Sequence, residues 1–161
     1  MQVEIDSATR EWIAKNPDLR WQQLLDYWHS LATASSRLPQ RREIDPAALS
    51  PDLLPSIFLI DVVRTNAGTP PRFRFRLLGS NIVDRESTKV GQYVDQLGPA
   101  VDVSKMVAQY RDCLAGKIRV RDSTLIWDSV RKEHIKYRVM LLPLAENGEI
   151  VNMIGLAIYE A

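Results

Sequence analysis

The residues that could do chemistry are few and lie far apart along this sequence. The single cysteine is Cys113, and the two histidines, His29 and His134, fall in separate predicted elements, so no spacing suited to zinc or iron ligands emerges. No Gly-x-Ser-x-Gly elbow, Gly-Lys-Ser/Thr loop or Gly-x-Gly-x-x-Gly fingerprint occurs. An isolated cysteine on an apolar helical face is more typical of a small buried residue than of a redox sensor. The sequence therefore favours recognition over catalysis, with no catalytic residue and no metal ligand.

Composition and charge narrow the range of partners. With 161 residues, 45% of them hydrophobic, the chain can build one well-buried core. A formal net charge of +1 gives no field that would draw the whole molecule to nucleic acid or a membrane. No apolar run approaches the roughly 18 residues that a membrane span needs. The lone cysteine and the lack of a signal-peptide pattern favour a reducing, cytoplasmic location, with neither nucleic acid nor membrane as a partner.

Two cap signals predict helices near the N-terminus. Asp6 is a candidate N-cap for a short helix, and Asn16, read as an N-cap before Pro17 and Asp18, marks the start of a longer one. The periodicity of the longer helix breaks near Ser35, which predicts a linker over 33–42. We therefore divide the chain into a helical extension with its linker, 1–42, and a main domain, 43–161. The apolar face of the longer helix consists of Trp21, Leu24, Leu25, Trp28 and Leu31.

Alternation of apolar and polar residues predicts a sheet in the rest of the chain. The first and last of the predicted strands are apolar on both faces and should be central. Short helices are expected after Gly79, and Asp102 should cap a longer helix that ends near Gly116. Asn147-Gly148 predicts a tight hairpin turn. The expected strands are 57–63, 72–77, 118–127, 134–144 and 150–159.

Short motifs occur along the chain beside this order of elements: Tyr27-Trp28, Pro39, Arg41, Arg42, Asp45-Pro46, Leu54-Pro55, the run from Phe73 to Gly79, and Gly91. The order of the elements resembles the PAS domain. Through these motifs the chain more narrowly resembles small stand-alone bacterial, mostly alphaproteobacterial, PAS-like proteins with an N-terminal Tyr-Trp helix. This resemblance implies an α+β fold: a five-stranded antiparallel sheet with short helices on one face and an N-terminal amphipathic helix.

PAS domains are sensory and dimerisation modules, and the resemblance implies a cavity between the sheet and the short helices. A haem-binding PAS domain usually places a histidine on the long helix, and 102–116 contains none. A flavin adduct needs a reactive cysteine on the first short helices, and 81–84 has none. Haem and a flavin adduct are therefore disfavoured, and the cofactor stays unknown. Candidate residues for the cavity wall are Phe75, Tyr93, Met106, Tyr110, Met140 and Met153.

Two surfaces are candidates for recognition. The helix face formed by Trp21, Leu24, Trp28 and Leu31 could pair across a two-fold axis, or it could pack on the open face of its own sheet. Arg76 should be tied to a carboxylate such as Asp45 or Asp61. A basic patch for an anionic partner could form from Arg119, Arg121, Lys136 and Arg138, unless these residues make a solvated face balanced by Asp122, Asp128 and Glu133.

The leading hypothesis is a stand-alone sensory or regulatory module, a homodimer that binds a small-molecule ligand or a signalling protein and acts in trans. The first alternative is a ligand-free structural adaptor or dimerisation protein in signalling, which an absent cavity would favour. The second is a small enzyme that uses the PAS-like pocket, and this would require a convergent acid, base or nucleophile in the cavity.

Overall fold

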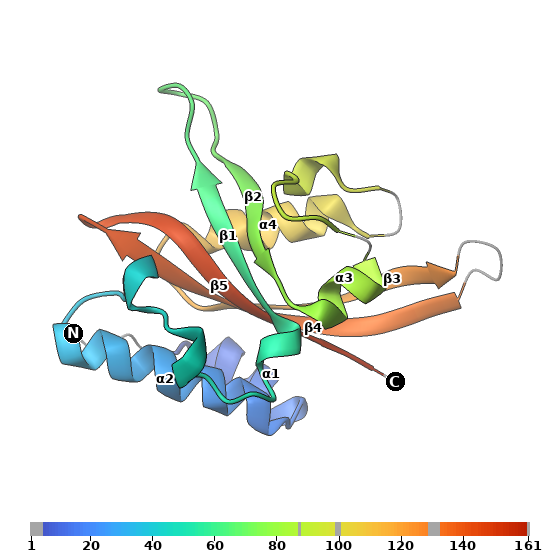
Figure 1. Ribbon diagram of the computed structural model, residues 1–161, viewed down its shortest axis with the longest axis horizontal. Helices are drawn as coiled ribbons and strands as arrows, with labels where there is room; N and C mark the ends of the chain where they lie inside the picture. The colour runs from blue at the N-terminus through green and yellow to red at the C-terminus, as the bar shows by residue number, and fades with distance from the viewer. Residues whose placement is uncertain (1–4, 87, 99–100, 129–132, 161) are drawn as a thin grey trace.

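The computed structural model describes residues 5–86, 88–98, 101–128 and 133–160. Its centre is one antiparallel five-stranded sheet with the order β2-β1-β5-β4-β3 (Figure 1). The α+β prediction is confirmed, and β5 and β1 lie inside the sheet, as their apolar faces indicated. The strands are β1 (Ile57–Val63), β2 (Arg72–Leu78), β3 (Arg119–Asp128), β4 (Glu133–Glu146) and β5 (Glu149–Tyr159).

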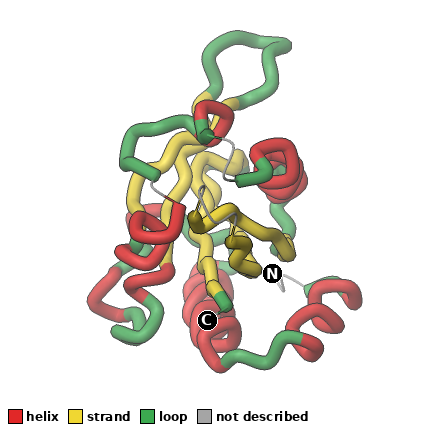
Figure 2. The backbone as a smooth tube through the Cα atoms, turned by 90° about the vertical axis from the view of Figure 1, so that its right-hand side faces the viewer, coloured by secondary structure: helices red, strands yellow, loops and turns green. Residues whose placement is uncertain are grey.

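Helices cover both faces of the sheet. In Figures 1 and 2, α2 runs along one face beside the shorter α1, whereas α3 and α4 lie on the other. Among the described residues, no helix is both long and apolar enough to cross a bilayer. The helices are α1 (Ser7–Lys15), α2 (Leu19–Ser35), α3 (Ser80–Glu86) and α4 (Val103–Cys113), with 3₁₀ turns η1 (Arg41–Glu43), η2 (Pro46–Ala48), η3 (Leu54–Ser56) and η4 (Val94–Gln96).

Side-chain caps define where the two N-terminal helices begin. Asp6 accepts a hydrogen bond from the Thr9 backbone N–H at 2.8 Å, so its predicted role is confirmed. The prediction that Asn16 caps α2 is wrong, because Asp18 does so by accepting from the Arg20 N–H at 2.9 Å. Asn16 instead ends α1, with its N–H donating to Trp12 and Ile13 carbonyls. Asn16 therefore ends α1 only two residues before Asp18 begins α2.

The aromatic face of α2 packs on its own sheet. Trp21, Leu24 and Trp28 are at most 1% exposed, and they contact β1, β4 and β5 through residues such as Leu142 and Ile154. The Trp28 indole Nε1 also donates to the Pro143 carbonyl at 3.0 Å. This corrects the interface prediction, since side chains already buried inside the chain cannot also pair across a two-fold axis. Leu31 is half-buried against the same cluster.

Gly79 lies where β2 turns into α3, and it touches the backbone of Pro55. Its N–H donates to the Ile57 carbonyl at 2.8 Å, and a Cβ at this position would overlap the Pro55 carbonyl. We expect Gly79→Ala to lower the free energy of unfolding by about 1–3 kcal/mol, since a rigid backbone cannot move aside as a side chain can. Urea denaturation measures this. Gly98→Ala is the control, because no described atom lies within 4 Å of its would-be Cβ, and equal losses in both variants would contradict the account.

Candidate functional site

Among the described residues, the space between the sheet and helices α3 and α4 is almost completely filled. The cavity that remains there has a volume of about 10 Å³, which is room for a single water molecule at most. Predicted wall residues Phe75, Met106 and Tyr110 do line it, and Met153 belongs to the same buried cluster. The other lining residues are Phe58, Ile82, Glu86, Arg121, Tyr137, Val139 and Ala157.

Two of the predicted wall residues lie elsewhere. Met140 is buried on the opposite face with the α2 cluster, because strand alternation turns Val139 and Leu141 toward α4 instead. Tyr93 is half-buried outside the core, and its ring lies under the Arg72 guanidinium, 3.8 Å from ring centroid to Cζ. The apolar character of Met140 and Tyr93 is compatible with a pocket wall. Met140 nevertheless lies on the other face of β4, and the loop before η4 places Tyr93 outside the core.

A buried arginine organises the polar part of this core. Arg121 is 6% exposed. Its Nε donates to Gln109 Oε1 at 2.8 Å, and its Nη1 donates to the Tyr137 hydroxyl at 3.1 Å. Gln109 in turn donates to the Val139 carbonyl at 3.2 Å. A charge inside a protein is tolerated only when its donors are satisfied, and this network from α4 to β4 satisfies them.

Glu86, the last residue of α3, directs its carboxyl group into the same cluster. Burial raises the pKa of this carboxyl from 4.5 to about 7, although the positive charge of Arg121 and the hydroxyls of Tyr159 and Tyr137 act in the opposite direction. The Tyr159 hydroxyl is buried without a hydrogen-bond partner of good geometry, and its ring stacks on Tyr137 with 5.2 Å between centroids. The carboxyl is therefore poised to change its protonation state near neutral pH.

Sequence reasoning did not select Glu86 and assigned Arg121 to the surface. An acid at the end of a short helix carries no local sign of burial. For Arg121 a signal exists, because it alternates with Ser123 and Leu125 and so shares the face of a buried leucine. Cys113 is also fully buried, and burial raises the pKa of its thiol to about 12, so the thiolate that redox sensing requires is suppressed.

The predicted basic patch does not form one surface. Cross-strand partners share a face, and the register pairs Arg121 with Val139 but Arg138 with Asp122. Arg119 and Arg121 therefore lie on one side of the sheet, and Lys136 and Arg138 lie on the other. Arg119 pairs with Asp6 at 2.9 Å, and Arg138 pairs with Glu160 at 2.8 Å. The proposed balancing side chains of Asp128 and Glu133 lie outside the described part of the chain.

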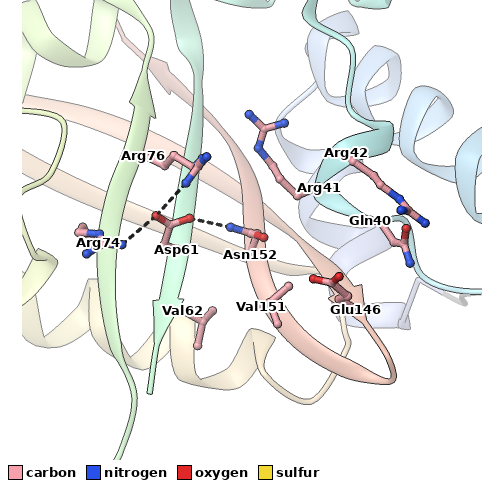
Figure 3. Close-up of a pocket in the computed structure, with 10 residues that line it drawn as sticks. All are labelled: Gln40, Arg41, Arg42, Asp61, Val62, Arg74, Arg76, Glu146, Val151 and Asn152. Atoms are coloured by element: carbon pink, nitrogen blue, oxygen red, sulfur yellow. Dashed lines mark hydrogen bonds and ion pairs between the residues drawn. The ribbon is translucent and has the colours of Figure 1, made fainter. Parts of the chain in front are cut away.

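A second hollow lies on the α2 side of the sheet, beyond the end of the apolar cluster. Its volume is about 610 Å³. Asp61 pairs there with Arg76 at 3.6 Å and with Arg74 at 3.3 Å, which confirms Asp61 as a partner of Arg76. We call this hollow the arginine groove; it is lined by Gln40, Arg41, Arg42, Asp61, Val62, Arg74, Arg76, Glu146, Val151 and Asn152 (Figure 3).

One family of known proteins matches most of this chain. A family model described as PAS domain matches residues 19–158. Among solved structures, a fungal LOV domain photoreceptor is 14% identical with a TM-score of 0.46, covering 79% of this chain and 86% of that one. An RNA-binding light-oxygen-voltage receptor is 18% identical with a TM-score of 0.45, covering 65% of this chain and 28% of that one. Curated proteins yield no match. Because the family model spans most of its length, the chain belongs to the PAS domain family.

Proposed function

We propose that this PAS domain is a regulatory module whose core is completed by its own side chains and which acts on a separate signalling protein through its surface. The observation that carries the proposal is the residual core cavity of about 10 Å³. Pockets that hold small organic ligands measure roughly 300–1,000 Å³. Of the alternatives drawn from the sequence, the adaptor without a core ligand fits this volume best.

The packing of aromatic rings supports the proposal that side chains fill the core. Tyr110 contacts Phe73 edge-to-face at 5.4 Å and Phe58 at 6.5 Å between centroids. The Phe58 ring lies directly over the backbone of Gly155, where any Cβ would overlap it. These rings come from β1, β2 and α4, so they close the space from several sides.

The same geometry argues against an enzyme, and we propose that this domain has no catalytic activity. The titratable groups of the core are directed at one another: Arg121 at Tyr137, and Glu86 at Arg121 and Tyr159. A substrate would have to displace these partners and find room that the packed side chains occupy. The cluster is better suited to coupling α3, α4 and the sheet than to transforming a molecule.

Native mass spectrometry of protein purified without denaturation tests the proposal, together with an absorption spectrum. We expect the mass of the polypeptide alone and no absorption beyond that of its aromatic side chains. An organic molecule retained at one per chain would contradict the proposal if the double variant Arg41→Gln/Arg76→Gln also retains it. That variant removes charge from the arginine groove, so a molecule that it still holds would lie in the core.

A further inference from the structure

The arginine groove holds more positive charge than its two carboxylates neutralise, because four arginines line it together with Asp61 and Glu146. Arg74 and Arg76 share Asp61, and the Asn152 side-chain amide donates to the same carboxylate at 2.7 Å. Sharing is possible because β2 bulges at Arg76: Leu77 pairs with Leu59 and Phe75 with Ile60, which leaves Arg76 as the extra residue. Two guanidinium groups therefore face one fully occupied carboxylate.

Arg41 adds a third positive charge from the opposite wall. Figure 3 shows its side chain extending from η1 toward Arg76, whereas Arg42 runs the other way. Among the described residues, the Arg41 guanidinium has no ion-pair partner, and its Nε is buried without a hydrogen bond. Buried donors are almost always satisfied in folded proteins. An unsatisfied one that lines a hollow indicates an acceptor that arrives from outside.

The turn that carries Arg41 is fixed in place. Glu43 accepts from the Gln40 backbone N–H at 2.8 Å and pairs with Arg37 at 2.7 Å. The first of these contacts caps the N-terminal end of η1, because Gln40 precedes the turn and Glu43 is its third residue. Arg41 therefore projects from a rigid support, and a ligand would not have to meet the entropic cost of ordering the turn.

The charge and the size of the groove identify a class of ligand. The four lining arginines against Asp61 and Glu146 leave a local excess of two positive charges, and a phosphate monoester carries about −1.5 to −2 at pH 7. Arginine forks bind phosphate oxygens in bidentate fashion. A volume of about 610 Å³ also leaves room for an organic body attached to the phosphate.

We propose that the arginine groove binds a small organic phosphate, a phosphate or pyrophosphate group joined to an organic body of nucleotide size. This site is separate from the filled core, so it goes beyond the proposed function. The phosphate would contact Arg41 and Arg76, and the body would occupy the remaining volume of the groove. Binding of this ligand in the groove would regulate the domain, whose core has no room for a ligand.

Isothermal titration calorimetry with ADP, inorganic pyrophosphate and citrate tests this proposal. We expect ADP and pyrophosphate to bind wild type at least about tenfold more tightly than citrate does. Arg41→Gln and Arg76→Gln should each weaken ADP binding about tenfold or more, which is the range for a lost charge-assisted hydrogen bond. Arg10→Gln removes the same charge from exposed α1, away from the groove, and should leave the affinity unchanged.

Three results would overturn the proposal. Equal affinity for citrate and ADP would show an unselective anion site. Unchanged ADP binding in Arg41→Gln would place the nucleotide elsewhere, and this variant should fold because no hydrogen bond or ion pair within the described residues holds the Arg41 guanidinium. Absence of binding by both ADP and pyrophosphate would also overturn it. None of these outcomes bears on the core, whose state is read from the intact mass of the chain.

Discussion

Replacing Trp28 with alanine should lower the free energy of unfolding by about 3–5 kcal/mol and leave the oligomeric state unchanged. The indole is fully buried between α2 and the sheet, where it contacts residues of β4 and β5. Its removal leaves a cavity and also leaves the Pro143 carbonyl without its 3.0 Å donor. Urea denaturation gives the loss in stability, and size-exclusion chromatography gives the subunit number.

Two further variants separate packing from hydrogen bonding. Trp28→Phe keeps an aromatic ring but loses the donor, so it should cost about 1–3 kcal/mol, and it remains measurable if the alanine variant fails to fold. Leu19→Ala, on the same helix but 71% exposed, should change stability by less than about 0.5 kcal/mol. A shift of Trp28→Phe toward a smaller oligomer would mean that this face pairs between subunits, contrary to the structure.

Raising the pH from about 5 to about 8 should destabilise the wild-type protein relative to Glu86→Gln. In the unfolded chain the Glu86 carboxyl has its ordinary pKa of 4.5, whereas burial raises the pKa to about 7 in the folded protein. Between these values the folded state holds more protons than the unfolded state, so the free energy of unfolding falls as pH rises through this window. The full effect is up to about 3 kcal/mol, and it is present above the folded pKa.

The glutamine variant isolates the contribution of Glu86 from that of every other ionisable group. An amide resembles the protonated carboxyl and cannot ionise, so both proteins should have similar stability at about pH 5 and diverge at higher pH. Glu11→Gln, an exposed position paired with Lys15 on α1, should keep the wild-type profile. Thermal unfolding followed by circular dichroism across pH gives the curves, and parallel curves for wild type and Glu86→Gln would contradict the role of Glu86.

Patterns that are local in the sequence predicted most of the fold. The alternation in Arg72 to Leu77 places Phe73 and Phe75 in the core and the arginines outside it, as observed. Asn147 and Gly148 both adopt positive φ in the hairpin turn, and Gly116 follows α4 in a left-handed conformation. These features succeed because each depends on backbone geometry that neighbouring residues determine.

Features that depend on pairing across the chain could not be read in the same way. The amphipathic face of α2 indicates burial, but it does not say whether the sheet or a second subunit covers it. The face of the sheet on which Met140 lies and the burial of Arg121 depend on which side chains of β3 and β4 point to each face. Likewise, Arg41 and Arg76 are far apart in sequence and line one hollow only because the fold brings η1 to the wall opposite Arg76 (Figure 3).

If the chain's own side chains fill the PAS core, xenon should find no room there, and xenon binding measures this directly. Xenon enters dry apolar cavities but not packed interiors. Wild type should show no saturable ¹²⁹Xe shift, whereas Phe75→Ala, which empties part of the core between the sheet and α3, should show one. Saturable xenon binding by the wild-type protein, abolished by Ala157→Leu at the same cavity, would reveal an open pocket and contradict the account.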